Sequence, residues 1–161
     1  MTRINCIPVS ELSDKHLGAE YRELPRIFAQ AAYAYDNGDD PSQYPDTYRL
    51  GTGHVRFFFT RLAYLRERFH QLVDEAHKRG RVVNFPEPPI ELVRHLPKSW
   101  KRNWVPTEEA RAINRARIAD KTKLALARAK VKGTKSGLKK IGNPLPRKRG
   151  DYERKALHNP T

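Results

Sequence analysis

Two stretches of the chain place apolar residues at the spacing of one helical face, with polar and charged residues between them. The first predicts a helix over 13–36 with Ser13 as its N-cap, and the second predicts a helix over 60–79 that stops at Gly80. Pro25 lies inside the first helix, where its missing backbone donor predicts a bend. The expected buried faces are Leu17, Tyr21, Leu24, Phe28, Ala31 and Tyr35 in the first helix and Leu62, Leu65, Phe69, Leu72, Val73 and Ala76 in the second.

A third helix is predicted to begin after Pro106 and Thr107 and to continue to Leu126 or beyond. Between the helices, residues 39–52 have the composition of a loop. Residues 82–104 contain four prolines, which prevent regular structure, so we expect this segment to wrap the helices with Trp100 and Trp104 holding it in place. The pattern therefore predicts an all-α protein, a single compact domain of about three helices with long irregular connections.

The aromatic run at 57–59, followed by Tyr64, raises the question of whether these rings stack on bases or belong to the core. The run leads directly into the second helix, whose apolar face must be covered. We therefore expect core positions for these rings.

Charge separates the end of the chain from the rest. Residues 126–161 carry 11 Lys and Arg against 2 Asp and Glu, whereas residues 1–125 carry 21 against 16. The end of the chain also contains many glycines and prolines and few large apolar residues, so it cannot bury enough surface to fold alone. We therefore expect a helical domain over 1–131 and a flexible basic tail over 132–161. The net charge of +14 favours a polyanionic partner, above all nucleic acid.

Composition also argues against several classes of protein. There is no apolar run near the about 20 residues that span a bilayer, and no signal peptide, so we expect a cytoplasmic protein with no membrane partner. The single cysteine, Cys6, excludes an internal disulfide and is expected to be a small buried hydrophobe. The six histidines do not form a metal-binding pair on a helix. We expect no metal, no other cofactor, no obligate protein partner and a monomer.

The most specific motifs lie in the first half of the chain. They are MTRIN at 1–5, VSEL at 9–12, HLGAEYRELPRIF at 16–28 and LGTGHVRFFFTRLAYLRER at 50–68, with a fainter EEARAINRARIADK at 108–121. In order and spacing they resemble the phage-type pyrimidine-dimer glycosylases, the endonuclease V family of ultraviolet repair, over roughly residues 1–125. The resemblance implies a bifunctional DNA glycosylase and abasic-site lyase that acts on double-stranded DNA carrying ultraviolet-induced cyclobutane pyrimidine dimers. It also implies that the first helix continues past Pro25.

Thr2 is the candidate nucleophile. Initiator methionine is usually removed before a residue as small as threonine, which leaves the α-amine of Thr2 free. Such an amine titrates at about 7.7–8.0, so a useful fraction is neutral at physiological pH. The resemblance implies that this amine attacks the sugar of the damaged nucleotide, displaces the base and leaves an imine. The imine then allows β-elimination, which needs no metal.

Glu23 is the candidate catalytic acid. Taken alone, it reads as a solvated helix carboxylate paired with Arg22 or Arg26. The resemblance instead implies that Glu23 stabilises positive charge on the opening sugar and moves protons during imine formation and elimination.

Basic residues supply the predicted DNA contacts. His16 lies seven residues before Glu23 on nearly the same helix face, which suits a DNA contact or support for the carboxylate, although capping or packing would also explain it. For the other cations the alternative is an ordinary solvated charge. The resemblance implies phosphate contacts for Arg3, Arg22, Arg26, Arg117 and Lys121.

Two alternatives remain open at this point. A glycosylase and lyase of the same mechanism could act on another damaged or modified base. A non-catalytic DNA-binding protein could have the same fold, and its DNA binding would then depend on the basic tail and not on Thr2 or Glu23.

Overall fold

A computed structural model describes the backbone of residues 3–139 and the side chains of residues 3–132. Within that range the chain is all-α, as the sequence pattern predicted, and it contains no β-strand. The α-helices are α1 (Asp14–Asp36), α2 (His54–Phe59), α3 (Leu62–Lys78) and α4 (Glu108–Lys139), and the short 3-10 helices are η1 (Val9–Glu11), η2 (Pro41–Gln43), η3 (Ile90–Val93) and η4 (Lys98–Trp100).

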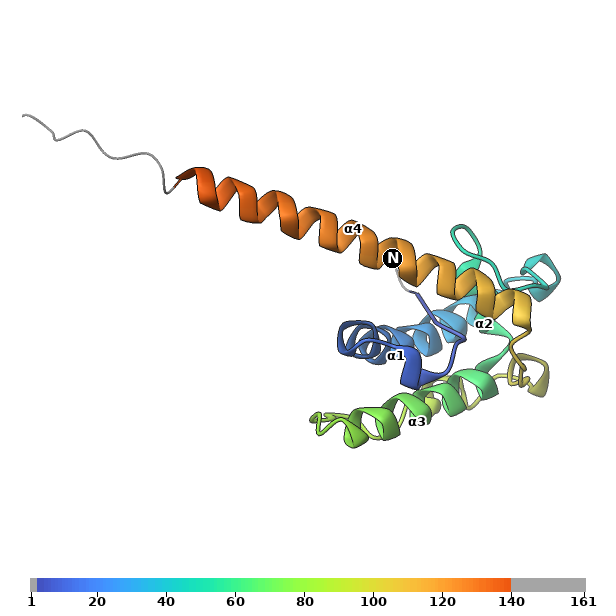
Figure 1. The fold of residues 1–161 in the computed structure, drawn as a ribbon. Helices are drawn as coiled ribbons and strands as arrows, with labels where there is room; N and C mark the ends of the chain where they lie inside the picture. Colours follow the sequence, from blue (N-terminus) through green and yellow to red (C-terminus); the bar gives the residue numbers. More distant parts are fainter. Residues whose placement is uncertain (1–2, 140–161) are drawn as a thin grey trace, which may run out of the picture. The chain divides into compact units, whose positions relative to one another are not determined.

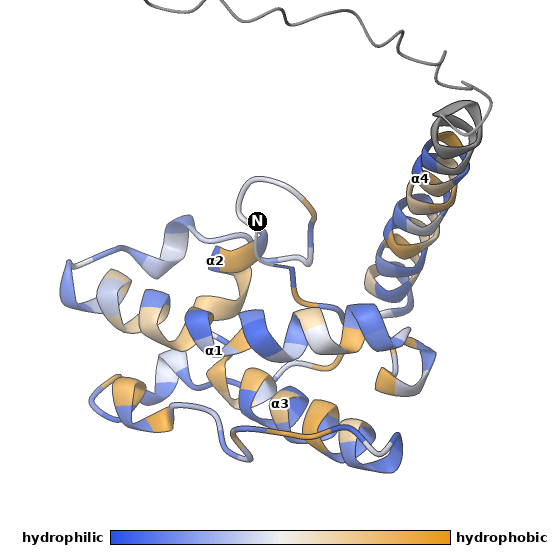
Figure 2. Ribbon diagram, turned by 90° about the vertical axis from the view of Figure 1, so that its left-hand side faces the viewer, coloured by the Kyte–Doolittle hydropathy of each residue, from blue (hydrophilic) through white to orange (hydrophobic). Residues whose placement is uncertain are grey.

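The chain divides into two compact units, Met1–Asp120 and Lys121–Thr161, and α4 crosses the boundary between them. In the first unit, α1 packs against α2, α3 and η3. Figure 1 shows α1 beside α2 and α3. Blue and orange segments alternate along α1 and α3 in Figure 2, as expected of helices that bury one face.

α1 confirms the first predicted helix. The Ser13 hydroxyl oxygen caps its first turn by accepting a hydrogen bond from the backbone N–H of His16 at 3.3 Å. The helix runs through Pro25 without a break, as the resemblance implied. Its buried face differs from the predicted one at both tyrosines. Tyr21 is half-buried against Phe69, with ring centroids 5.4 Å apart, and Tyr35 is exposed. Each aromatic ring has a hydroxyl at its tip, which favours a place at the edge of a core.

α3 confirms the second predicted helix. All six of its predicted apolar residues are buried. The helix ends at Lys78, and Gly80 follows with φ of 67°, a left-handed conformation that glycine adopts without a steric penalty.

α2 is a short helix that the sequence pattern did not separate from the start of α3. It carries Phe57, Phe58 and Phe59, which are buried and confirm the expected core positions. Tyr64, on α3, is buried as well and stacks on Phe58, with ring centroids 5.8 Å apart.

The connection over residues 82–104 has no regular structure except η3 and η4. Trp104 stacks on Tyr48 with ring centroids 5.8 Å apart and meets Phe57 edge-on at 5.0 Å. Trp100 is buried and meets Tyr35 edge-on at 5.3 Å. The two tryptophans therefore hold this connection against the helices, as expected.

α4 confirms the predicted start of the third helix, because the Thr107 side chain caps it by accepting from Ala110 N at 3.1 Å. The helix continues to Lys139, past residue 132, at which we expected the tail to begin. Residues 140–161 of that expected tail lie outside the described residues. Among the helices in the described range, none combines the length and apolarity that crossing a bilayer requires.

Candidate active site

Residues 4–7, here called the N-terminal segment, are buried in the first unit although they belong to no helix or strand. Each of their four backbone N–H groups donates to a side chain. The acceptors come from three helices, α1, α2 and α4. The bonds run from Ile4 to His54 Nε2 (3.0 Å), from Asn5 to Glu20 Oε1 (3.2 Å), and from Cys6 and Ile7 to Asn114 Oδ1 (2.8 and 3.3 Å).

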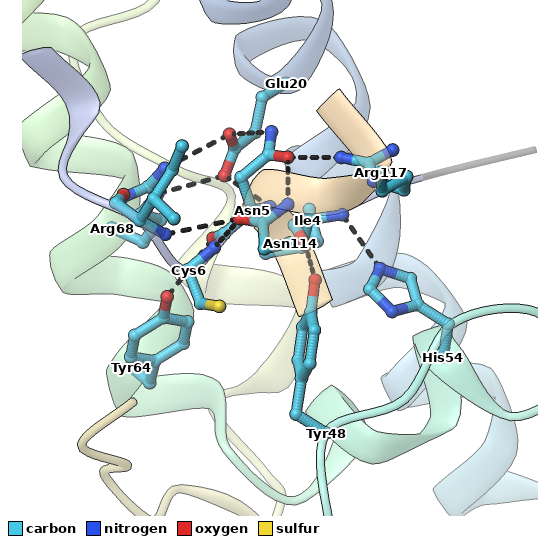
Figure 3. A network of polar contacts seen from close by, with 11 residues as sticks. Ile4, Asn5, Cys6, Glu20, Tyr48, His54, Tyr64, Arg68, Asn114 and Arg117 are labelled. Atoms are coloured by element: carbon cyan, nitrogen blue, oxygen red, sulfur yellow. Dashed lines mark hydrogen bonds and ion pairs between the residues drawn. The ribbon is translucent and has the colours of Figure 1, made fainter. Parts of the chain in front are cut away.

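The carbonyl groups of the same segment also bind side chains. The donors are the Tyr48 hydroxyl to Ile4 O (3.2 Å), the Tyr64 hydroxyl to Asn5 O (3.3 Å) and Arg68 Nη1 to Ile7 O (2.7 Å). Figure 3 shows these side chains converging on the segment from several elements. All four N–H groups and three carbonyl groups of the segment thus bind side chains, where a strand in a sheet would bind the backbone of its neighbours. We call these side chains, together with that of Asn5, the polar network.

Glu20 and Arg68 form the centre of the polar network. Their side chains are 0% and 3% exposed, and Arg68 Nε lies 2.9 Å from Glu20 Oε1. Glu20 Oε2 also accepts from Arg68 Nη2 at 3.3 Å and from Asn5 Nδ2 at 2.6 Å. Burial of two charges is unfavourable unless their hydrogen-bonding groups are satisfied, and here several charge-assisted bonds provide this.

His54 binds the first residue of the segment, and its own ring has a defined protonation state. Its Nδ1 lies 2.7 Å from the Arg49 carbonyl, which can only accept, while its Nε2 faces the Ile4 N–H, which can only donate. The ring is therefore neutral, with its proton on Nδ1. Burial lowers the pKa of His54, and the positive charges of Arg117 and Arg3 act in the same direction.

The backbone before α2 explains why His54 lies at this point. Gly53 precedes it with φ of 87°, and a Cβ there would lie 2.8 Å from Pro45 Cγ. A larger residue would therefore be strained in the turn that starts the helix. Gly53 allows α2 to begin where His54 can reach the N-terminal segment.

Arg117 is one of the predicted DNA contacts, and it contacts the polar network through Asn5. Its Nη2 donates to Asn5 Oδ1, which also accepts from Asn114 Nδ2 at 2.9 Å. The side chain is half-buried, and burial lowers the pKa of the guanidinium, with the charge of Arg3 acting in the same direction. Part of Arg117 is thus engaged inside the protein.

The predicted residues of α1 lie on its outer side. The Glu23 side chain is 30% exposed, and its Oε1 lies 3.1 Å from Nη1 of Arg26, which is 67% exposed. This is the ion pair that the sequence spacing suggested, and Arg22 beside it is exposed. Glu23 lies one turn after Glu20 on the same helix, so the two carboxylates have neighbouring positions but opposite environments.

His16 lies in the first turn of α1, with Nδ1 2.9 Å from the Ser13 hydroxyl. Burial lowers the pKa of His16, and the positive charge of Arg117 adds to this effect. Arg117 thus lies within electrostatic range of both His16 and Arg3. Lys121 is exposed and belongs to the second unit, and Thr2 lies outside the described residues.

Most members of the polar network were not among the residues predicted from sequence, although one signal could have revealed the central pair. Glu20 follows Leu17 by three positions on the apolar face of α1, and Arg68 follows Leu65 by three on that of α3. Opposite charges on two faces that must be buried predict a buried ion pair between the helices. The residues overlooked were Asn5, Glu20, Tyr48, His54, Arg68 and Asn114.

Cys6, in the same segment, is buried, as expected of a small hydrophobe. Burial raises the pKa of its thiol to about 11, so the thiol is protonated at neutral pH. Across the described residues, no group of three or more His, Cys, Asp or Glu side chains is placed to hold a metal ion. The cations and carboxylates around the segment suit the binding of an anionic ligand and the handling of protons.

A comparison with known protein families matches residues 1–87 to the pyrimidine dimer DNA glycosylases. The matched part contains the N-terminal segment and helices α1, α2 and α3. Asn114, Arg117 and Lys121 lie beyond it, as does the fainter resemblance over 108–121. Since the match covers more than half of the 161 residues, the chain belongs to the pyrimidine dimer DNA glycosylase family, which implies DNA glycosylase activity and a damaged DNA substrate.

Proposed function

We propose that this protein removes cyclobutane pyrimidine dimers from double-stranded DNA and then cuts the strand as an abasic-site lyase. In this proposal the nucleophile is the α-amine of Thr2, set free by removal of Met1. The observation that supports it best is the polar network, which holds the N-terminal segment directly after Thr2 and Arg3. Buried hydrogen bonds to every N–H of residues 4–7 suit a chain end that must be presented in one place.

The chemistry needs only an amine and proton transfer. The lone pair of the amine attacks C1′ of the damaged nucleotide, and the bond from C1′ to the base nitrogen breaks, with its electron pair leaving on the base. The attached nitrogen loses one proton, and its lone pair then forms the C=N bond as the C1′–O4′ bond breaks. O4′ keeps that electron pair and takes a proton, which gives a ring-opened, protonated imine. The protonated imine draws electrons, so a C2′ proton is lost and the bond from C3′ to the phosphate oxygen breaks. Water then hydrolyses the imine and frees the amine.

Glu23 is assigned to the proton transfers of this sequence. It is half-buried on α1, one turn after Glu20, whose carboxylate contacts the N-terminal segment. A partly exposed carboxylate can reach a bound sugar and exchange protons with solvent, whereas Glu20 is fully enclosed by its partners. The same helix therefore provides one carboxylate for structure and one for the reaction.

The proposed DNA contacts are Arg3, His16, Arg22, Arg26, Arg117 and Lys121, with the basic tail adding attraction that does not depend on sequence. Arg22 and Arg26 are exposed, as phosphate contacts must be. A protein that neutralises several phosphates loses affinity steeply as salt rises. Recognition of the lesion would come from the weakened and deformable duplex at the dimer, which eases extrusion of a nucleotide.

The test is a borohydride trapping assay on duplex DNA that carries one cyclobutane thymine dimer. We expect a strand break at the dimer and a covalent complex whose attachment maps to Thr2. Thr2→Ala should keep the activity, because alanine also allows removal of Met1 and leaves a free α-amine. Thr2→Leu should abolish trapping, since the bulky second residue keeps Met1 in place, and mass spectrometry verifies both N-termini.

The other outcomes of this assay lead to different conclusions. Trapping only on a ready-made abasic site would keep the lyase and point to another damaged or modified base as the substrate. DNA binding without trapping on either substrate would leave a binding protein and refute the proposed chemistry.

A further inference from the structure

We propose that His54, assisted by Glu20 and Asn114, is a positioning residue that sets the place of the N-terminal amine. This inference rests on the proposed role of Thr2. The polar network would then have a function separate from stability. It fixes the position of each residue of the segment, and this in turn limits how far the chain can extend toward the DNA.

The hydrogen bonds of the network specify one register. Asn5 is the only residue of the segment whose side chain both donates to Glu20 and accepts from Asn114, at 2.6 and 2.9 Å. A shift of the chain by one residue would place an isoleucine or cysteine opposite these groups and leave them without partners. Unsatisfied buried polar groups are strongly unfavourable, so the segment has one stable placement.

Among the side chains that accept from the N–H groups of the segment, His54 binds the residue nearest to the amine. It accepts from Ile4 N, and only Thr2 and Arg3 come between that atom and the free end. Covalent geometry limits the distance from the Thr2 nitrogen to Ile4 N to about 7 Å. If the bond to His54 is lost, the Tyr48 hydroxyl still holds the Ile4 carbonyl, but the Ile4 N–H is released. The backbone before Ile4, and with it the amine, then gains freedom.

Stability alone does not account for a network of this kind. A protein with a buried ion pair and its hydrogen-bonded neighbours is often no more stable than one with apolar side chains of similar volume at these positions. Here the polar side chains of α1, α2, α3 and α4 all turn toward the same four residues. Their common effect is to hold a segment that lies in no helix or strand, which is what a positioned nucleophile requires.

The experiment compares His54→Leu, which removes the acceptor, with His54→Gln, which can place an oxygen near the former Nε2. Thr60→Val is the matched control. Thr60 is buried, its hydroxyl accepts from Arg102 Nη2 at 2.9 Å, and it makes no bond to the N-terminal segment. For each variant we would measure the single-turnover rate of borohydride trapping on an abasic-site duplex. We would also measure the affinity of each variant for a duplex with a tetrahydrofuran abasic-site analogue, and the urea concentration at the midpoint of unfolding.

We expect the trapping rate of His54→Leu to fall by about tenfold or more, because ordering one further backbone residue reduces a rate by roughly that factor. Affinity should stay within about twofold of the wild type, since His54 does not belong to the proposed DNA contacts. His54→Gln should recover most of the rate. Thr60→Val should lose stability without losing rate.

Three results would overturn the inference. One is a trapping rate in His54→Leu equal to that of Thr60→Val, and another is a loss of rate and affinity together in proportion to stability. The third is a wild type that forms no trapped complex at Thr2, in which case both the proposed function and this inference fail. The first two results contradict this inference alone, so the two failures can be distinguished.

A second variant decides the matter if His54→Leu does not fold. One glycine inserted between Arg3 and Ile4 leaves the polar network intact and moves the amine by about 3.5 Å. We expect an unchanged urea midpoint and a trapping rate reduced by at least tenfold. An unchanged rate would show that the network does not set the place of the amine.

Discussion

Glu20 and Arg68 form a buried ion pair, with Arg68 Nε 2.9 Å from Glu20 Oε1, that joins α1 to α3 beside the N-terminal segment. Each partner also binds the segment, Glu20 through Asn5 and Arg68 through the carbonyl of Ile7. The pair therefore links two helices and the chain's beginning in one contact. Removal of either partner would leave the other charge buried.

Glu20→Gln should lower the free energy of unfolding by about 3–5 kcal/mol, because the Arg68 charge would remain buried without its counterion. Urea denaturation followed by circular dichroism measures this. Glu91→Gln is the matched control, since Glu91 pairs with Arg94 at 2.8 Å on the surface. Its loss should stay below about 1 kcal/mol. Similar small losses in both variants would contradict the structural role of the buried pair.

Glu23→Gln should reduce lyase turnover by about 10²–10⁴-fold, the usual contribution of a positioned acid or base. DNA affinity should change far less, because a glutamine keeps the shape and removes only a carboxylate that repels phosphates. Single-turnover cleavage of an abasic duplex gives the first quantity, and fluorescence anisotropy gives the second.

Glu91→Gln serves again as the control for Glu23, because both carboxylates form an ion pair with an arginine three residues later. It should leave turnover unchanged. A parallel loss of turnover and affinity in Glu23→Gln would rule out the catalytic assignment.

Stability should fall as the pH decreases below about 6.5, the ordinary pKa of histidine. The folded protein keeps His54 neutral because burial lowers its pKa, with Arg117 and Arg3 acting in the same direction and Glu20 and the Arg49 carbonyl opposing them. The unfolded chain binds the proton first. Each such histidine contributes a slope of up to about 1.4 kcal/mol per pH unit until the folded pKa is reached.

His54→Gln should therefore give a flatter stability curve below pH 6.5 than the wild type. His16 also has a lowered pKa, so His16→Gln measures the share of that second group. Urea titrations at several pH values supply the curves. An identical slope in the wild type and in His54→Gln would show that His54 does not titrate as the buried ring requires.

Cys6 should react with a thiol reagent at pH 8 more than a hundredfold slower in the folded protein than in urea. The thiol is buried, and burial raises its pKa to about 11, so both access and thiolate fraction are low. Absorbance after addition of a disulfide reagent follows the reaction. Rapid labelling under folding conditions would mean that the N-terminal segment opens readily.

The helices and their buried faces were predictable because each depends on local spacing. Ser13, Gly80 and Thr107 act as the caps and stops that their chemistry suggests. α2 was missed because its six residues are too few to show a period. Tyr21 and Tyr35 were placed too deeply, since spacing alone does not distinguish the centre of an apolar face from its edge.

The polar network was harder to predict, since its contacts join residues that are distant in the sequence. His54 and Asn114 carry no local pattern that marks them as partners of residues 4–7. The catalytic candidates on α1 came from motif resemblance, which pointed to Glu23 and passed over Glu20. The motif itself does not distinguish the enclosed carboxylate from the accessible one, whereas the position of Glu20 on the apolar face of α1 does.

Asn114 follows Cys6 by 108 residues, and yet it supplies the acceptor for that residue's backbone N–H. During synthesis the N-terminal segment leaves the ribosome first, whereas the start of α4 leaves it much later. The N-terminal segment is therefore incompletely held until the chain has been made at least as far as Asn114. An incomplete chain that lacks α4 has the same first residues but no acceptor from Asn114 for the backbone N–H groups of Cys6 and Ile7.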